Sequence, residues 1–184
     1  RAPPGLRAEG QTDLAGGFSP AVLADLTAQA QSGSLAAFDH ERLYNGRYVC
    51  VMRKDHPLAR GPLTLKRFCE ARHMLVSFSG RPYGFIDEAL ASLGRKRRVV
   101  LTVNQFFTAG RVVSTSDLLT VLPAHFVGTT GRAHELAYRE LPFDVPRVHA
   151  AALWHRRQGQ RSDHAWLRLA FAASARKSFA QDAS

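Results

Sequence analysis

The 184-residue chain has only two cysteines and no long apolar run, and both features limit what it can be. Cys50 and Cys69 have neither the spacing of a zinc site nor that of a disulfide framework, so we expect two reduced, buried thiols. No apolar stretch approaches the roughly 20 residues of a membrane-spanning helix, and the amino-terminal RAPPGLRAEGQ lacks the apolar core of a signal peptide. We therefore expect a cytoplasmic protein with no membrane partner. Since the chain begins at Arg1 and not at Met, we also expect it to be a piece of a longer polypeptide.

The chain also lacks the motifs that mark catalytic and metal sites. Neither a G-x-S-x-G motif nor a phosphate-binding loop occurs. None of the eight histidines has a second histidine four residues away or lies in a Cys–His cluster of the kind that binds zinc. Cys69 and His73 are four residues apart but span a junction between a predicted helix and a predicted strand, which indicates packing. We expect no catalytic residue, no metal and no cofactor.

Acidic residues are scarce, and the net charge is +10. Arginine supplies 21 of the 25 positive charges, mostly as single residues; the one run, Arg95 to Arg98, follows Gly94, which has the position of a helix C-cap. The sequence has no helix-turn-helix pattern and no aromatic platform for bases. We do not expect this chain to bind nucleic acid directly, since an arginine-biased genome or an acidic partner explains the charge as well.

The stretch from Arg98 to Pro123 is the most informative part of the sequence. The apolar run 99–103 predicts a buried strand, Asn104-Gln105 a turn, and 106–114 a helix. Ser116-Asp117 predicts a second turn before a strand over 118–122, which Pro123 ends. This order predicts a βαβ unit whose polar turns lie at the carboxyl edge of a parallel sheet, where ligands bind in open α/β folds. No acid, base or nucleophile stands beside a partner there, which favours binding over catalysis.

Strands and helices alternate along the rest of the chain, which indicates an α/β fold. Crossings near 70–73 and 142–146 predict two lobes, one built from residues 1–73 and 147–184 and the other from 74–146. Two lobes joined by two crossings form a cleft that closes on a small molecule by hinge motion. The predicted strands cover 13–18, 42–51, 73–78, 138–141 and 148–154, and the predicted helices cover 21–30, 63–71, 85–93, 132–137 and a last helix from Ser162.

Several segments resemble the effector-sensing domain of LysR-type transcriptional regulators. The long ERLYNGRYVCVMRKDHPLA followed by SDLLTVLP is the most specific pair, and its Ser-Asp resembles the NodD-like branch. Together the similar segments run from about Asp13 to Phe171. They are DLAGGF (13–18), ERLYNGRYVCVMRKDHPLA (41–59), HMLVSFSG (73–80), GFIDEALASLG (84–94), SDLLTVLP (116–123) and AALWHRR (151–157).

The resemblance implies a two-lobed, periplasmic-binding-protein-like (type 2) fold, in which each lobe is a mostly parallel sheet flanked by helices. It implies a small-molecule effector in the cleft, self-association into a homo-dimer or tetramer, and DNA contact only through an N-terminal winged helix-turn-helix that is absent here. Members open the domain with a strand and helix that we do not find before Asp13, so we expect an incomplete first lobe. A solute-binding protein of a transport system and a small enzyme on the same scaffold remain alternatives.

The candidate effector contacts are polar and aromatic residues at predicted strand ends. Hydroxyls and free backbone N–H groups hold a carboxylate or phenolic oxygen, and an amide beside an aromatic ring suits a planar ligand, so we expect an aromatic or carboxylate effector. The competing interpretation makes the serines turn residues, Asn104 a helix cap and Phe106 a core residue. The six candidates are Ser77, Ser79, Asn104, Phe106, Gly17 and Phe18.

Overall fold

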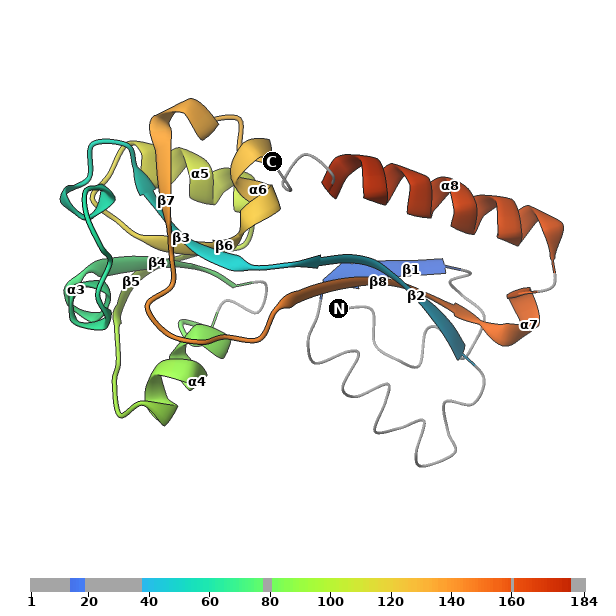
Figure 1. Cartoon of the computed structure of the whole chain (residues 1–184), viewed down its shortest axis with the longest axis horizontal. Helices are drawn as coiled ribbons and strands as arrows, with labels where there is room; N and C mark the ends of the chain where they lie inside the picture. Colours follow the sequence, from blue (N-terminus) through green and yellow to red (C-terminus); the bar gives the residue numbers. More distant parts are fainter. Residues whose placement is uncertain (1–13, 19–37, 78–80, 160, 180–184) are drawn as a thin grey trace. The chain divides into compact units, whose positions relative to one another are not determined.

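The computed structural model describes residues 14–18, 38–77, 81–159 and 161–179, and they belong to two compact units (Figure 1). Unit 1 combines Arg1–Gly46 with Arg147–Ser184, and unit 2 is Arg47–Pro146. The second boundary agrees with the predicted crossing at 142–146. The first lies earlier than the predicted boundary after residue 73, because strand β3 (Tyr48–Arg53) pairs only with strands of unit 2.

The predicted single strand over 42–51 is therefore two strands. Strand β2 (Phe38–Gly46) belongs to unit 1 and β3 to unit 2, and the break between them falls at Arg47. The sequence shows one continuous apolar alternation because each half of it faces a core, although the two cores are different. Periodicity alone could not locate this change of unit.

Unit 2 contains a three-stranded sheet, in the order β6-β3-β7, and a strand pair, β4-β5, that an isolated bridge joins to it. Strand β3 lies between β6 and β7 and runs antiparallel to both, whereas β4 and β5 are parallel to each other. The two parts join where Met74 N donates to Leu119 O at 2.8 Å and Leu119 N donates to Arg72 O at 2.9 Å. This bridge is parallel, so β4, β5 and the strand that follows α5 share one direction, as the predicted βαβ unit requires. The strand bounds are β4 Arg72–Val76, β5 Arg98–Val103, β6 Thr120–Pro123 and β7 Leu136–Glu140.

Helices cover both faces of this sheet (Figure 1). Val49 and Val51 of β3 pack into a core with α5 and α6, while Cys50 and Met52 pack into a second core with α3 and α4. The period-2 alternation of a strand thus serves two cores at once. The helical elements are η1 Pro57–Ala59, α3 Leu65–Glu70, α4 Phe85–Ser92, α5 Phe106–Ser114, α6 Ala124–Thr129 and η2 Ala133–Glu135.

The helices of the structure agree with only some of the helices predicted from the sequence. The prediction of a helix over 106–114 is confirmed by α5. The helix predicted over 132–137 is wrong, because only the short turn η2 forms before Leu136 starts β7. Helix α6 was not expected, because it follows Pro123 directly and has only six residues in which to show a period. The helix predicted over 21–30 lies outside the described residues.

The described part of unit 1 is an antiparallel sheet with two helices. Strand β8 (Val148–His155) lies between β1 (Leu14–Phe18) and β2. Two helices follow, α7 (Arg156–Gly159) and α8 (Ser162–Phe179), the latter starting at the predicted Ser162. The expectation of mostly parallel sheets is therefore wrong for the described strands of this unit, since every pair runs antiparallel. Among the described helices of both units, none is long and apolar enough to cross a membrane.

Candidate functional site

The carboxyl ends of β4 and β5 lie next to each other in unit 2. Val76 and Val103 are register partners at the ends of these two parallel strands. Ser77 continues β4 and its backbone N–H donates to Val103 O at 2.8 Å, so the first residue past β4 stays attached to β5. Asn104 is the first residue past β5. Two of the six candidate residues, Ser77 and Asn104, are thus placed side by side by the sheet itself.

Asn104 does not act as the helix cap that the competing interpretation assigned to it. The N-cap of α5 is Gln105, and neither Gln105 nor Asn104 makes a side-chain hydrogen bond with another described residue. Gln105 therefore does not cap α5 with its side chain, and a helix amino terminus attracts negative charge. The exposed Asn104 amide lies one residue before this terminus. The sequence did not point to Gln105, because a glutamine at a cap position is an uncommon choice.

Phe106 has one side in the core and is the first residue of α5. Its ring stacks on Phe126 of α6, with ring centroids 4.4 Å apart and planes inclined by 23°. It also packs against the core cluster that contains Val49 and Val113, yet it remains partly accessible. The core interpretation of Phe106 is therefore correct for one face of the ring. The following residue, Phe107, is 63% exposed.

The other three candidates belong to unit 1 or lie outside the described residues. Ser79 lies outside the described residues. Gly17 and Phe18 belong to β1 of unit 1, where their backbones are register partners of Ala151 and Ala150 in β8. We refer to Ser77, Asn104, Phe106 and the amino terminus of α5 as the strand-end site.

Three ionisable groups in the interior of unit 2, His73, Cys50 and Asp87, have shifted pKa values. Burial lowers the pKa of His73 to about 4, and its Nε2 is 2.7 Å from Phe68 O. Burial raises the pKa of the Cys50 thiol to about 12, so it is not a nucleophile near neutral pH. For Asp87, burial works against ionisation, but hydrogen bonds from Arg97 outweigh it and hold the pKa low. These groups stabilise the core and offer no acid or base to a ligand at the strand-end site.

Both cysteines of the chain belong to unit 2. Cys50 and Cys69 are both free, and Cys50 is fully buried while Cys69 is only partly so. Within the ranges that the structure describes, no group of three His, Cys, Asp or Glu side chains could hold a metal ion. Chemically, the strand-end site offers a hydroxyl, an amide, backbone N–H groups and an aromatic surface, which are binding groups.

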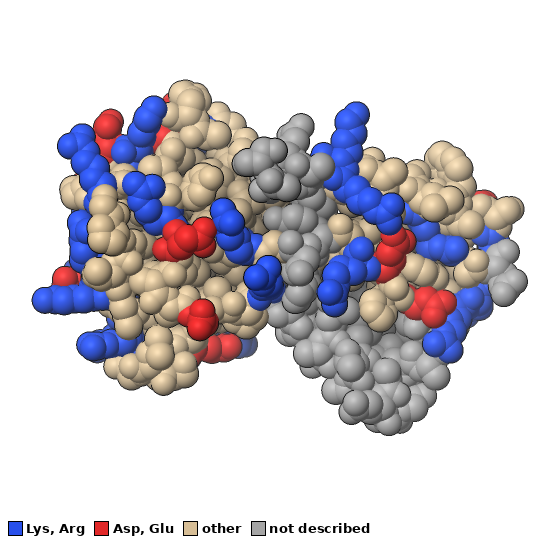
Figure 2. All heavy atoms as spheres, in the orientation of Figure 1, with Lys and Arg blue, Asp and Glu red and all other residues tan. Residues whose placement is uncertain are grey.

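The surface charge is spread out on the visible face. Figure 2 shows Lys and Arg side chains at many separate places on both units, with Asp and Glu between some of them. Salt bridges account for part of this mixing, as in Arg47 with Glu140 and Arg53 with Asp117. A continuous basic stripe of the kind that follows a nucleic-acid backbone is not visible on this face.

Comparison with known proteins identifies the family. A model of the LysR substrate binding domain matches residues 8–176. The HTH-type transcriptional activator NagR of a Ralstonia species is 32% identical over 162 residues, which are 88% of this chain and 50% of NagR. The HTH-type transcriptional activator NahR of Pseudomonas putida is 31% identical over 159 residues, 86% of this chain and 49% of NahR. The chain spans about half the length of these relatives.

Solved structures agree with the family match. The regulatory domain of MexT, a transcriptional activator in Pseudomonas aeruginosa, superposes with a TM-score of 0.71 at 26% identity, covering 92% of this chain and 76% of that domain. The chain belongs to the LysR substrate-binding domain family and has its two-lobed, periplasmic-binding-protein-like fold. The resemblance noted from the sequence is thereby confirmed. The relatives are named as regulators, which favours a regulator over the transport protein and enzyme alternatives.

Proposed function

We propose that the chain is the effector-sensing domain of a bacterial LysR-type transcriptional regulator and binds a small molecule at the strand-end site. The observation that carries this proposal is the pairing of the β4 and β5 ends, which places Ser77 beside Asn104, directly before the amino terminus of α5. Hydrogen-bond donors beside a helix amino terminus bind a carboxylate or phenolate, and the accessible side of Phe106 adds an aromatic contact. An aromatic acid is the effector class with both features. The proposal extends to Ser79, Gly17 and Phe18 on the family resemblance alone.

A ligand screen with matched variants tests the strand-end site. Aromatic acids, phenolics and flavonoid-like compounds are screened by thermal shift, because a compound that binds only the folded state raises the melting temperature. For a hit, Asn104→Ala should raise the dissociation constant about tenfold, as expected for one lost polar contact. Gln105→Ala removes the adjacent exposed amide and should change the constant less than threefold. Equal losses in both variants, or no loss in either, would contradict the assignment of Asn104.

We further propose that copies of the domain associate through unit 2. Strand β5 pairs only with β4 among the described strands, so one edge of it is open, and its Val100 and Leu101 are 43% and 39% exposed. An open edge with apolar side chains favours pairing with another chain. Light scattering over micromolar concentrations should detect a dimer, and Leu101→Lys should shift it toward monomer. Leu169→Lys on α8 of unit 1 is the matched control, and a dimer equally weakened by it would overturn the choice of β5.

The DNA-binding and location proposals concern the whole regulator. We propose that a winged helix-turn-helix encoded before Arg1 contacts DNA in the cytoplasm, and that effector binding changes its grip. Sequencing the gene upstream of Arg1 is the direct test. An upstream region that encodes an export signal in place of a helix-turn-helix would refute this proposal and favour a solute-binding protein.

A further inference from the structure

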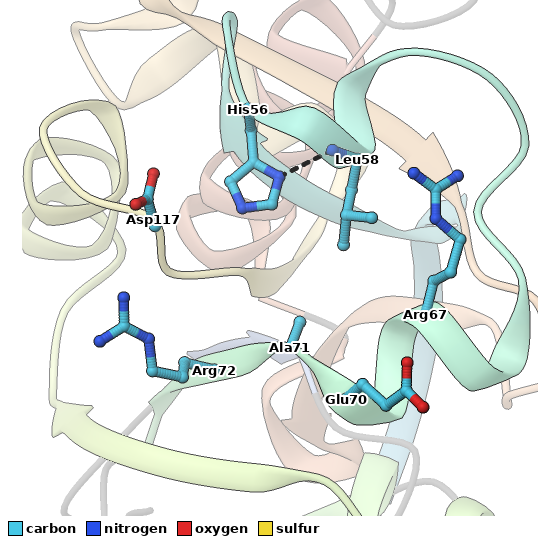
Figure 3. A pocket seen from close by; sticks show the side chains of 7 residues that line it. All are labelled: His56, Leu58, Arg67, Glu70, Ala71, Arg72 and Asp117. Atoms are coloured by element: carbon cyan, nitrogen blue, oxygen red, sulfur yellow. Dashed lines mark hydrogen bonds between the residues drawn. The ribbon is translucent and has the colours of Figure 1, made fainter.

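A polar pocket lies at the opposite end of β4 from the strand-end site, entirely within unit 2 (Figure 3). Its volume is about 380 Å³, and it opens between η1, α3, the start of β4 and the Ser116-Asp117 turn. Strand β4 runs from Arg72 at the pocket to Val76 beside Ser77. A five-residue strand spans about 16 Å, so the pocket and the strand-end site are separate places on one lobe.

Arg72 brings a positive charge to this pocket. Its exposed side chain makes no hydrogen bond or ion pair with another residue that the structure describes, and in Figure 3 its guanidinium lies below Asp117. In the sheet, Arg72 is the register partner of Arg98 on β5, which is likewise exposed and without a described partner. Like charges opposite each other on neighbouring strands repel, so a bound anion would lower the energy of this arrangement.

The acidic groups of the pocket do not supply that anion. Asp117 accepts from Arg53, with the Arg53 Nη2 to Asp117 Oδ1 distance 2.8 Å, and this contact holds the pKa of Asp117 low. Glu70 is paired with Lys66 one helical turn earlier in α3, at 3.8 Å. Each carboxylate therefore has its own cation outside the pocket lining. The charge of Arg72 also contributes to the low pKa of Asp117, but the two side chains form no ion pair or hydrogen bond, so the N–H donors of the Arg72 guanidinium are not used by the described residues.

Hydrogen bonds hold two further side chains that line the pocket, Arg67 and His56, in place. The guanidinium of Arg67 donates to Pro62 O at 2.9 Å and to Pro57 O at 3.4 Å, which holds a second positive charge at the pocket without neutralising it. His56 is buried, and its Nδ1 accepts from Leu58 N at 3.0 Å. Burial, together with the charge of Arg53, lowers the pKa of His56, so the ring is neutral near pH 7.

We propose that this pocket binds the oxyanion group, carboxylate or phosphate, of a small molecule, with Arg72 as its main contact. A planar guanidinium binds either group through two parallel hydrogen bonds, and a second cation at Arg67 adds attraction. The cavity is large enough for a small metabolite. The site lies apart from the strand-end site, so this proposal goes beyond the effector-sensing function and does not depend on it.

The test is an NMR titration of the ¹⁵N-labelled chain with inorganic phosphate and, separately, with acetate, each at ionic strength held constant with sodium chloride. We expect saturable shifts of the amide signals of Arg72, Ala71 and Leu58, while the signals of Ser77 and Asn104 stay in place. Arg72→Gln should weaken binding at least tenfold. Arg72→Lys keeps the charge but not the two parallel hydrogen bonds of the guanidinium, so it should weaken binding by a smaller factor. Saturation with only one of the two anions identifies which oxyanion the pocket takes.

Arg111→Gln is the matched control, because Arg111 is an exposed arginine of unit 2 that does not line the pocket. It makes the same change in net charge and should alter binding less than twofold. Shifts that do not saturate, an equal loss in Arg72→Gln and Arg111→Gln, or shifts confined to Ser77 and Asn104 would each overturn the proposal. Circular dichroism spectra of the variants exclude unfolding as the cause of a loss. Failure here leaves the aromatic-acid screen at the strand-end site unaffected.

Discussion

Units 1 and 2 are stabilised in different ways in their described parts. Unit 2 buries large side chains on both faces of its sheet, among them Met52, Phe68, Ile86 and Leu122. In the described part of unit 1, the buried cluster consists of Leu43 and three alanines, Ala150, Ala152 and Ala172. Because hydrophobic stabilisation scales with the apolar area buried, the described part of unit 2 gains more of it than the described part of unit 1.

Two arginine–aspartate ion pairs, one in each unit, show the same contrast in burial. The Arg97–Asp87 pair in unit 2 has side chains that are 0% and 10% exposed, and both guanidinium contacts are 3.0 Å or shorter. The Arg156–Asp39 pair in unit 1 has a similar distance of 2.9 Å, but its side chains are 61% and 44% exposed. Water screens the second pair and not the first, so equal distances correspond to unequal energies.

The largest expected effect is the loss of a buried ring from unit 2. Phe68 is fully buried and packs edge-on against Phe143, with centroids 5.3 Å apart. Phe68→Ala should lower the free energy of unfolding by about 4 kcal/mol, because it removes apolar contacts and leaves a cavity. Both tryptophans, Trp154 and Trp166, lie in unit 1, so fluorescence reports that unit, while far-UV circular dichroism reports both.

In a urea titration of Phe68→Ala, we expect the dichroism midpoint to fall by more than the fluorescence midpoint. Phe107→Ala is the control, since Phe107 is largely exposed, and it should change the free energy by less than about 0.5 kcal/mol. Identical shifts of both midpoints in Phe68→Ala would show that the units unfold as one and would remove the contrast between them.

The next effect comes from the buried ion pair. Asp87→Ala leaves the Arg97 guanidinium buried without its carboxylate and also removes the acceptor of the Gly84 N–H at the start of α4. We expect a loss of about 3 kcal/mol, whereas Asp39→Ala should cost less than about 0.5 kcal/mol. Chemical denaturation of the two variants side by side measures both. A cost for Asp39→Ala as large as that for Asp87→Ala would contradict the role assigned to burial.

A smaller effect is the pH dependence that His73 gives to unit 2. The unfolded chain has the ordinary value of 6.5, and burial lowers the folded pKa to about 4, so the unfolded state binds more protons between these values. Stability is therefore full above pH 6.5 and declines as the pH falls toward 4, by about 2–3 kcal/mol for this residue. His125, whose pKa burial also lowers to about 4, adds to the same decline.

His73→Gln should flatten the decline between pH 6.5 and 4 but leave the part due to His125. Unfolding midpoints collected from pH 4 to 7.5 give the profiles. A variant profile that keeps the full wild-type slope would mean that His73 is not the source.

The difference between the units also decides what could be predicted from the sequence. In unit 2, helix 106–114 and the strands around it follow from the local apolar period, because each element faces a core made by its neighbours. The change from β2 to β3 at Arg47 could not be predicted, because the alternation continues through it while the pairing partners change. Likewise, the antiparallel direction of β8 depends on partners distant in sequence, which local patterns do not encode.

The strand-end site could likewise be predicted only in part from the sequence. Position after a strand was enough to select Ser77 and Asn104, and the structure places them side by side. The assignment of the α5 cap to Gln105 depends on backbone angles that residue type did not suggest. The pocket at Arg72 was not found, because its lining comes from four segments that have no common motif.

The smallest expected effect compares two glycines of unit 2 that differ only in their surroundings. A Cβ added at Gly110 in α5 would lie 2.4 Å from Thr130 Cβ, whereas a Cβ at Gly128 in α6 would meet nothing within 4 Å. Neither glycine has a positive φ, so alanine suits both backbones. Gly110→Ala should destabilise the protein by about 1–2 kcal/mol, because the backbone contact between α5 and Thr130 must open. Gly128→Ala should stabilise it by about 0.5 kcal/mol, because alanine costs less entropy in a helix. Thermal unfolding of the two variants measures both changes in stability, and we expect them to have opposite signs. A gain in stability in both variants would show that Gly110 is not tightly packed against Thr130.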